Sequence, residues 1–478
     1  MPTPVFSSYT LQLRGNMPKW TRRGILKAGL AISAGAASPW RAWASPLALP
    51  SKQQLAWQDL EFGMFIHFSP ATWQNQEFDD LKTPLSEINP TKLDTDQWVE
   101  TALALGARYI VFVAKHQGGF CMWQTHTTEY SIRNTPWRDG KGDVLAEIAA
   151  SCRKKGVPLG VYVGARDDDF GAGDGGQCKA PELQRKYNEL YRQQLTEVFS
   201  RYGELIEIWF DGSTIVPVSD LIRRYQPNAV VFQSPAASIR WVGNEDGVAP
   251  YPCWNAVNTA KARTGISTSS DGDPDGATWL PSEVDVSIRR PDWFWSTTNA
   301  NKVLTVDQLM SVYYRSIGRG AQLLLNIPAN RDGLLPQPDC ETAVAFGKEL
   351  TRRFGHPLGV ARGTGPSLIL RLDRPARIDT AAIQEEISKG ERIRAYRIEG
   401  EIDGSWVTLA EGSAIGHKRI QPVDPQTVSA LRLLITKSAA TPLIRSFAAF
   451  NTEEPATRAG ILPNPFLSSR KNASPARV

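Results

Sequence analysis

The sequence is poor in the residues that build metal centres and disulfide scaffolds. Its 478 residues include five cysteines and five histidines. The cysteines are scattered without a CxxC pair and the histidines form no HExxH motif, so we predict neither a zinc site nor a disulfide framework. The sequence also contains no phosphate-binding loop and no Ser/His/acid signature. We therefore expect no metal and no cofactor.

Long runs of one charge or of apolar residues are also scarce. The formal net charge is +5 and no Lys/Arg run of the kind that binds nucleic acid occurs outside the termini, which argues against a nucleic-acid partner. The weakly apolar stretch at 24–38 is too short to cross a bilayer, so we expect no membrane span in the mature protein. With 41% apolar residues over this length, the chain can bury a large core and should form one large and one smaller domain. The oligomeric state is not predictable from these features.

The N-terminal 44 residues resemble a twin-arginine export signal. Arg22 and Arg23 precede the weakly apolar stretch, and residues 42–44, Ala-Trp-Ala, offer an A-x-A cleavage site. The alternative is a signal-anchor or a disordered basic leader. We expect a periplasmic or secreted protein whose mature chain begins near Ser45.

Between residues 50 and 355, strand-like runs alternate with helical patterns. The apolar runs lie at 62–68, 109–115, 158–165, 207–212, 229–235 and 322–328. The helical patterns lie at 94–107, 142–156, 180–203, 218–227 and 307–320. Repeated βα units imply a parallel sheet. Their number favours a (β/α)8 barrel over a doubly wound sheet, because no Gly-rich dinucleotide loop follows the first strand.

The pattern changes after residue 355. Short alternating stretches such as SLILRLD, SWVTLAEG and SALRLLITKS are separated by Gly, Pro and Asp. This pattern predicts an antiparallel β-sandwich domain over 356–452. The remaining residues, 453–478, are rich in Pro, Ser, Asn and Arg and are expected to be disordered.

In a barrel of this kind, catalytic residues lie at the carboxyl ends of the strands. In EIWFDG, residues 207–212, the apolar run ends in Asp211, which is followed by Gly212. Because burying an unpaired carboxylate is costly, Asp211 should lie where its strand leaves the core. Three other predicted strands are also followed or ended by residues that can be charged: His67, Lys115 with His116, and Arg166 with Asp167.

Paired carboxylates are the chemistry that these residues permit. Retaining glycoside hydrolysis needs two of them, separated by roughly 5–5.5 Å, and Asp211 would be the nucleophile. Four acids are candidates for the proton donor: Glu245, Glu77, Glu283 and Asp285. Glu245 suits the task because it lies in a Gly-rich loop beside Trp241, whose indole would desolvate it. Glu283 and Asp285 alternate on a predicted strand and could instead be ion-paired inside the barrel.

Several motifs together resemble the alpha-L-fucosidases of glycoside hydrolase family 29. They are FGMFIHF, AKHQGGFCMWQTHTTEYSI, KGDVLAEIAASCRKKG, EIWFDG, RWVGNE, SEVDVSIRRPDWFW and LLLNIPANRDG, and they follow one another in the family's order over 55–335. The resemblance implies a retaining mechanism with Asp211 as nucleophile and Glu245 as acid/base. The WVGNE and EVDVSIR segments further resemble the branch that acts on alpha-1,3- and alpha-1,4-linked fucose, so the expected partner is a fucosylated glycan.

The resemblance also implies a set of sugar-binding residues. They are His67, Glu77 and His116, with Trp293 or Trp295 as the aromatic residue that packs against the sugar. We also expect Gln117, which follows His116, and Trp209, which precedes Asp211, to bind the substrate. Trp209 could equally be a core residue. In place of the second His and the Asp of the family's Lys-His-His-Asp-Gly-Phe motif, this chain has Gln117 and Gly118. Gln cannot titrate near neutrality and Gly lacks a carboxylate, so sugar recognition is expected to differ here.

Three alternatives remain open at this point. A carbohydrate-binding protein on a degenerate barrel would bind sugar without turnover, and a glycosidase for a related sugar such as alpha-L-galactose would use the same two carboxylates. The acidic run RDDDFGAGDGG at 166–176 could bind a cation through oxygen ligands. Its spacing fits no calcium loop, however, and we expect a solvated charge run or a mobile loop at the barrel mouth.

Overall fold

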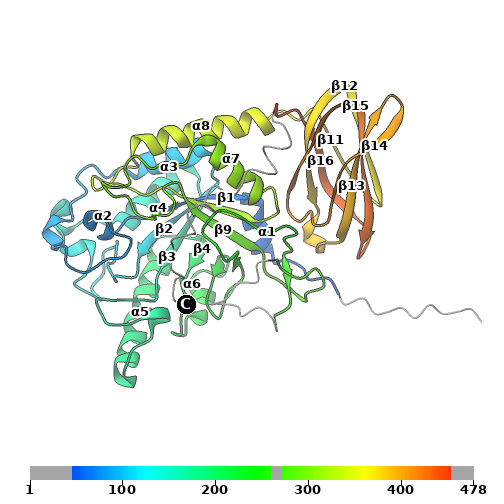
Figure 1. Ribbon diagram of the computed structural model, residues 1–478. Coiled ribbons are helices and arrows are strands. Elements are labelled where there is room, and N and C mark those ends of the chain that lie inside the picture. Colours follow the sequence, from blue (N-terminus) through cyan, green and yellow to red (C-terminus); the bar gives the residue numbers. More distant parts are fainter. Residues whose placement is uncertain (1–45, 260–270, 454–478) are drawn as a thin grey trace, which may run out of the picture. The chain divides into compact units, whose positions relative to one another are not determined.

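The computed structural model describes residues 46–259 and 271–453, which contain a parallel eight-stranded sheet (Figure 1). The strands are hydrogen-bonded in the order β5, β4, β3, β2, β1, β10, β9 and β6. Their bounds are β1 Phe62–Ile66, β2 Tyr109–Lys115, β3 Leu159–Val163, β4 Leu205–Trp209, β5 Val230–Phe232, β6 Arg240–Trp241, β9 Ser282–Ser287 and β10 Gln322–Asn326. A single parallel bridge between Phe232 and Ile239 joins the two ends of this sheet, so the barrel is nearly closed. The predicted export signal and nearly all of the predicted tail lie outside the described residues.

Most of these strands are almost continuously apolar, whereas β9, Ser282–Ser287, alternates polar and apolar residues. Every residue of β1, β2, β3, β9 and β10 is buried, as expected for parallel strands that pack side chains on both faces. Inside the barrel, large aromatic side chains from neighbouring strands fill the space, among them Phe65, Tyr109, Tyr162 and Trp209. The interior is therefore a packed core, and a ligand can enter only at one end of the strands.

Helices cover the outside of the barrel. Their bounds are α1 Lys52–Leu60, α2 Ala71–Gln74, α3 Thr95–Leu105, α4 Val144–Lys155, α5 Pro181–Arg201, α6 Ser219–Tyr225, α7 Val306–Arg315 and α8 Gln337–Phe354. In α3 the buried side chains of Trp98, Ala102 and Leu105 recur at helical spacing. The Asp94 side chain caps its first turn and Gly106, with φ 93°, ends it. No helix in the described part of the chain is long and apolar enough to cross a membrane.

The barrel departs from a regular (β/α)8 pattern between β5 and β9. Among the described residues of this stretch there is no helix, and the chain passes from β5 to β6 through residues 233–239. A small antiparallel hairpin, β7 (Ala256–Val257) and β8 (Thr278–Trp279), lies between β6 and β9. Residues of this stretch, which forms loops in place of helices, reach the carboxyl end of the barrel.

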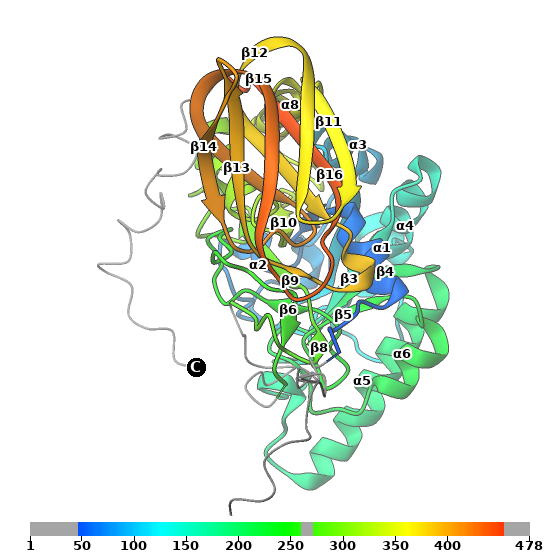
Figure 2. The same ribbon diagram turned by 90° about the vertical axis from the view of Figure 1, so that its right-hand side faces the viewer.

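Six further strands form an antiparallel sheet that curves around its own apolar core (Figure 2). Their bounds are β11 Gly359–Thr364, β12 Ser367–Glu385, β13 Ile393–Ile402, β14 Ser405–Gly412, β15 Arg419–Ser438 and β16 Leu443–Phe450. The long strands β12 and β15 change register between Arg371 and Ala376, where the sheet bends. The predicted combination of a parallel barrel with an antiparallel β domain is confirmed.

Charged side chains join the barrel to this sheet. Asp59, in α1, accepts a hydrogen bond from His417 Nε2 at 2.9 Å and pairs with Arg445 of β16 at 2.5 Å. Glu61, which follows α1, pairs with Lys418. The segment between β14 and β15 therefore contacts the first helix of the barrel.

Candidate active site

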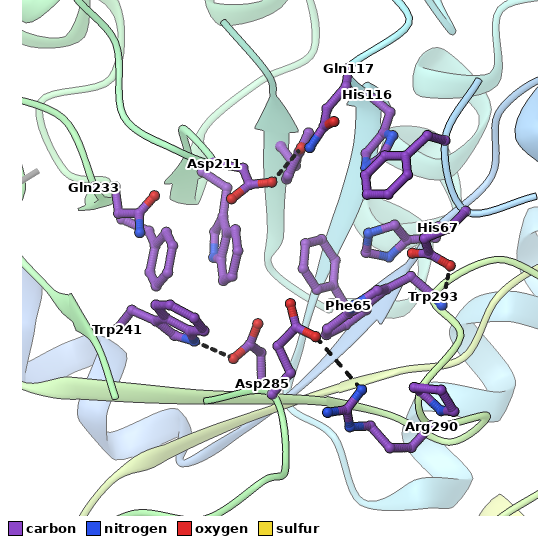
Figure 3. Close-up of a pocket in the computed structure, with 17 residues that line it drawn as sticks. Phe65, His67, His116, Gln117, Asp211, Gln233, Trp241, Asp285, Arg290 and Trp293 are labelled. Carbon is purple, nitrogen blue, oxygen red and sulfur yellow. Dashed lines mark hydrogen bonds and ion pairs between the residues drawn. The ribbon is translucent and has the colours of Figure 1, made fainter. Parts of the chain in front are cut away.

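A cavity of about 380 Å³ opens at the carboxyl ends of the barrel strands (Figure 3). Every strand of the barrel except β10 contributes side chains to it, either directly or through the loop that follows the strand. Its walls are Phe65, His67, Glu77, Phe78, His116, Gln117, Tyr162, Trp209, Asp211, Phe232, Gln233, Trp241, Glu245, Asp285, Arg290, Pro291 and Trp293. Eight of the nine sequence-predicted site residues are in this list; Trp295 is not.

Asp211 lies two residues beyond the end of β4 and points into the cavity (Figure 3). Tyr162 donates a hydrogen bond from its hydroxyl to Asp211 Oδ2 at 3.1 Å. Gln117 and the backbone N–H of Gly212 also donate to this carboxylate, and Gly212 turns the chain away with φ 68°. Burial raises the pKa of Asp211, whereas the three donors oppose that rise by stabilising the ionised form. The carboxylate is thus held in a fixed position inside an apolar wall.

Glu245 reaches the cavity from the loop that follows β6. Its side chain is 41% exposed, and its Oε2 lies 3.7 Å from Arg290 Nη1. Burial raises the pKa of Glu245, and the charge of Asp211 raises it further, although Arg290 acts in the opposite direction. Because the two carboxyl groups oppose each other's ionisation, one of them can retain a proton at a pH at which the other is charged.

Glu77 is a second acid on the same side of the cavity. Its Oε2 accepts a hydrogen bond from the backbone N–H of Trp293 at 2.9 Å. Burial raises the pKa of Glu77 to about 7, with further contributions from Asp292 and Glu245. The same contact fixes the chain at Trp293, whose ring lies 5.1 Å from that of His67. Glu77 therefore both lines the cavity and positions one of its aromatic walls.

The two histidines of the cavity are neutral at physiological pH. Burial lowers the pKa of His116 to about 3, and it lowers that of His67 well below the usual range. His67 Nδ1 lies 2.9 Å from Asn326 Oδ1, which fixes the orientation of its ring. Buried His116 Nδ1 has no hydrogen-bond partner among the described residues. Neutral imidazoles can exchange hydrogen bonds with sugar hydroxyls but add no positive charge.

Trp209 forms part of the cavity wall and is also anchored in the barrel core. Its ring stacks on Phe232 at 3.6 Å, and its Nε1 donates to Glu207 at 2.6 Å and to Glu283 at 3.0 Å. Glu283 is fully buried beneath the cavity and does not line it. The two interpretations of Trp209, core residue and cavity wall, thus both apply.

Glu283 and Asp285 are not ion-paired in the described part of the chain. Both are acids on the inner face of β9, since alternate residues of a strand point the same way. Burial, and the neighbouring charge of Glu207, hold the pKa of Glu283 well above its usual range. Asp285 lines the cavity, where its Oδ1 accepts a hydrogen bond from Trp241 Nε1 at 2.6 Å. Tyr109, Trp209 and Trp241 donate hydrogen bonds to these two acids, and no cation pairs with either acid within residues 46–259 and 271–453.

Asp79 fills the space beside Gly118. A Cβ on Gly118 would lie 2.6 Å from Asp79 Cβ, closer than such atoms approach. The Asp79 carboxylate accepts hydrogen bonds from Tyr130 at 2.7 Å and from Gln74 at 2.8 Å. Any residue larger than Gly at position 118 would therefore overlap Asp79 unless Asp79 moved.

The acidic run at 166–176 is held by ion pairs. Asp167 pairs with Lys115 at 2.6 Å, and both side chains are almost completely buried. Arg166 pairs with Asp168 at 2.8 Å and Asp174 at 3.2 Å. In the described residues, no group of three or more His, Cys, Asp or Glu side chains is arranged to hold a metal ion. Lys115, Arg166 and Asp167 thus support the loops around the cavity and do not line it.

Several cavity residues were not predicted from the sequence. Tyr162, Gln233, Phe65 and Arg290 face the cavity, although nothing about these residue types distinguishes them from core or surface residues. A sequence signal existed for Phe65, which lies in the motif FGMFIHF, and for Tyr162 and Arg290. Tyr162 lies on the inward phase of the predicted third strand, and Arg290 lies inside the quoted segment SEVDVSIRRPDWFW.

A parallel barrel whose carboxyl end carries several carboxyl groups in an aromatic-walled cavity defines the protein as a glycoside hydrolase. Comparison with known proteins specifies this class further. The family model described as alpha-L-fucosidase matches residues 71–353, and the chain belongs to this family.

The relatives of the chain agree with this assignment. It is 34% identical to alpha-L-fucosidase 1 of Arabidopsis thaliana, over 83% of this chain and 86% of the relative. A solved glycoside hydrolase 29 family member from an unknown rumen bacterium is 30% identical, with a TM-score of 0.78 over 88% of this chain and 80% of that one. A Ruminococcus gnavus GH29 fucosidase is 25% identical, with a TM-score of 0.76 over 88% and 98% of the two chains. Alpha-L-fucosidase activity follows from these likenesses at the level of the family.

Proposed function

We propose that this protein releases alpha-L-fucose from fucosylated glycans by double displacement, with Asp211 as nucleophile and Glu245 as acid/base. The proposal depends on one observation: both carboxyl groups line the same cavity, where the charge of Asp211 raises the pKa of Glu245, and Asp211 is held by three hydrogen-bond donors whereas Glu245 has one, Trp293. Donors that stabilise the anion favour the nucleophile, and a raised pKa favours the proton donor. The Ruminococcus gnavus relative has been solved in complex with fucose, which supports this sugar as the ligand.

In the first step, Asp211 attacks the anomeric carbon while Glu245 donates a proton to the departing glycosidic oxygen. The product is a glycosyl ester on Asp211 and a free acceptor sugar. In the second step, Glu245 removes a proton from a water molecule that attacks the same carbon, which regenerates Asp211 and releases fucose. Two inversions give net retention of configuration. Neutral His67 and His116 and the indole of Trp293 would hold the sugar during both steps.

The mechanism is tested with the protein lacking residues 1–44 and an aryl alpha-L-fucoside. Asp211→Asn should lose at least about 1,000-fold in kcat, because no nucleophile remains. Glu245→Ala should lose much less on an aryl substrate with a good leaving group, and azide should restore turnover by trapping the glycosyl ester as fucosyl azide. Proton NMR of the first product should show the alpha anomer. An initial beta product, or an Asp211→Asn variant with full activity, would contradict the mechanism.

We further propose a preference for alpha-1,3- and alpha-1,4-linked fucose. Support comes from the segments WVGNE at 241–245 and EVDVSIR at 283–289, which surround Glu245 and supply Trp241 and Asp285 to the cavity wall. Fucose release is measured in parallel from a Lewis-type trisaccharide and from an aryl fucoside. A kcat/KM that is at least tenfold higher on the trisaccharide would support the branch. Equal rates, or a preference for alpha-1,2-linked fucose, would contradict it.

We also propose export through the twin-arginine route. The support is the sequence of residues 1–44, with Arg22 and Arg23 before a short apolar stretch. Replacement of both arginines by lysine should leave the full-length precursor inside the cell, whereas the native sequence should yield a processed protein outside the cytoplasm. Processing of the Lys-Lys variant at the native rate would rule out this route.

A further inference from the structure

Asp285 is an acid in the cavity wall. One of its carboxyl oxygens accepts a hydrogen bond from a side chain, and the other has no side-chain partner. Asp285 is 5% exposed, and its Oδ1 accepts the 2.6 Å hydrogen bond from Trp241. Among the described residues, no side chain forms a hydrogen bond or ion pair with Asp285 Oδ2, and the only other hydrogen bond to the carboxyl group comes from the backbone N–H of Asp285 itself. Figure 3 shows Trp241 on one side of the Asp285 carboxyl group and the cavity on the other. Asp285 Oδ2, the oxygen without a side-chain partner, is therefore the one available to a ligand.

The charges around Asp285 disfavour its ionisation. Glu245, from the loop after β6, and Asp211, from the end of β4, both act on it across the cavity. Glu283 lies two residues earlier on the same face of β9, and it interacts in turn with Glu207 of β4. The nearest cationic side chain in the cavity wall, Arg290, pairs with Asp246 at 3.1 Å and with Glu245 at 3.7 Å. Asp285 thus faces carboxyl groups from three strands, and no cation pairs with it in the part of the chain that the structure describes.

These surroundings fix the protonation state of the group. Burial, with the charge of Glu245, raises the pKa of Asp285 to about 8, so its neutral form predominates below that pH. An indole N–H can only donate a hydrogen bond, so Oδ1 must act as the acceptor. The proton of the neutral acid consequently lies on Oδ2, the oxygen that faces the cavity.

We propose that Asp285 works as a neutral hydrogen-bond donor to a hydroxyl oxygen of the sugar bound in the cavity, close to the bond that is cleaved, and that it transfers no proton during turnover. This inference rests on the proposed cleavage of a fucoside at the same site. A neutral donor contributes recognition without adding a further negative charge beside Asp211. It also discriminates against analogues that lack the hydroxyl group, because the buried donor would then be left unpaired.

Two variants separate this role from that of an acid that must ionise or transfer its proton. Asp285→Asn keeps an acceptor for Trp241 and places an N–H₂ donor where the neutral acid has its O–H. Asp285→Leu has a similar volume but no donor. The readouts are kcat and KM on an aryl alpha-L-fucoside from pH 5.5 to 9.5, the affinity for L-fucose by calorimetry, and circular dichroism to confirm folding.

We expect Asp285→Asn to keep kcat/KM within about tenfold of the native value below pH 7. It should also bind fucose with less decline above pH 8 than the native protein, in which Asp285 loses its proton there. Asp285→Leu should lose about 10- to 100-fold in affinity for fucose, the range expected for one buried hydrogen bond. A loss of more than 1,000-fold in kcat for Asp285→Asn, comparable to that of Asp211→Asn, would overturn the proposal. Full fucose affinity in Asp285→Leu would overturn it as well.

The same experiment separates a failure of this inference from a failure of the proposed function. If the native protein binds fucose but does not cleave the fucoside, the proposed reaction is wrong, while the affinities of the two Asp285 variants still decide the inference. If the native protein cleaves the fucoside and Asp285→Asn does not, the inference alone is wrong. If the native protein neither binds nor cleaves, both are wrong.

Discussion

At the scale of single residues, the site depends on hydrogen bonds that hold carboxyl groups in place. The hydroxyl of Tyr162 is one of three donors to Asp211. Removing it by Tyr162→Phe should lower kcat/KM about 10- to 100-fold, because the carboxylate loses both orientation and stabilisation of its charged form. Since this hydrogen bond lowers the pKa of Asp211, its loss should raise that pKa, and the fall in activity on the acid side should begin at a higher pH. The pH dependence of kcat/KM measures both effects.

Tyr130 provides a matched control for this prediction. Its hydroxyl also donates to a carboxylate, Asp79, at 2.7 Å, but Tyr130 does not line the cavity. Tyr130→Phe should therefore leave the position of the acid limb unchanged while removing the same kind of hydrogen bond. A shift of equal size in both variants would show that the effect of Tyr162→Phe is indirect.

Gly118 carries a second prediction at this scale. Gly118→Ala should lower the free energy of unfolding by about 1–3 kcal/mol, because the new Cβ would overlap Asp79. Combining it with Asp79→Ala should cost less than the sum of the two single changes, since the overlap is then relieved. Urea unfolding of the four proteins measures this coupling. Simple additivity would mean that the two positions do not compete for the same space.

Site residues next to predicted strands could be predicted from the sequence, whereas those in loops without periodicity could not. Asp211 could be predicted because an acid directly after a buried strand would be costly to bury in the core and so lies at the end of the strand. The structure places it in the cavity. Trp293 and Trp295 could not be distinguished, because the loop that carries them has no periodicity. The backbone N–H of Trp293 donates a hydrogen bond to Glu77, which selects the residue that faces inward, and this contact joins segments 216 positions apart. The state of Asp285 likewise depends on acids from other strands.

At the scale of elements, the loops around the cavity are held by the buried pair of Lys115, the last residue of β2, and Asp167, which follows β3. Lys115→Met should lower the free energy of unfolding by about 3–5 kcal/mol, because it leaves the Asp167 carboxylate buried without a counter-charge. Adding Asp167→Asn should recover part of this loss, as the group left behind is then neutral. Thermal and urea unfolding test both variants. A double variant that is no more stable than Lys115→Met would argue against an electrostatic origin.

The predictability of the elements themselves depends on their length and continuity. The strands of the barrel that are continuously apolar over five or more residues were recognised, whereas β6 has only two residues and gives no pattern. The short stretch SLILRLD predicts a strand of its own, yet it is only the first part of β12, which continues to Glu385. Pro375 lies within β12, where the register with β15 shifts between Arg371 and Ala376. A proline at such a bulge interrupts the hydrogen-bond ladder without ending the strand, which the sequence alone does not reveal.

At the scale of the whole molecule, the antiparallel sheet is attached to the barrel by charged groups at the end of α1. Lys418 pairs with Glu61, and these side chains are 20% and 13% exposed. The contact holds the pKa of Glu61 below its usual value against the effect of burial, so its stabilising contribution is present above the unfolded-state pKa and is lost as the pH falls through the lower folded value. The sheet should therefore be held more weakly in acid than at neutral pH.

Lys418→Met tests how much this pair contributes. It leaves Glu61 partly buried without its main partner and should lower the free energy of unfolding by about 2 kcal/mol at pH 7, with a smaller effect near pH 3, where Glu61 is protonated more readily. Lys92→Met is the matched control, because Lys92 and Asp332 are also paired across the chain at 3.0 Å but are 66% and 48% exposed. Solvent screening should reduce that effect to less than about 1 kcal/mol. Unfolding curves at both pH values give the comparison. Equal losses in the two variants would mean that the pair at α1 is no more than a surface contact, and that apolar packing holds the sheet to the barrel.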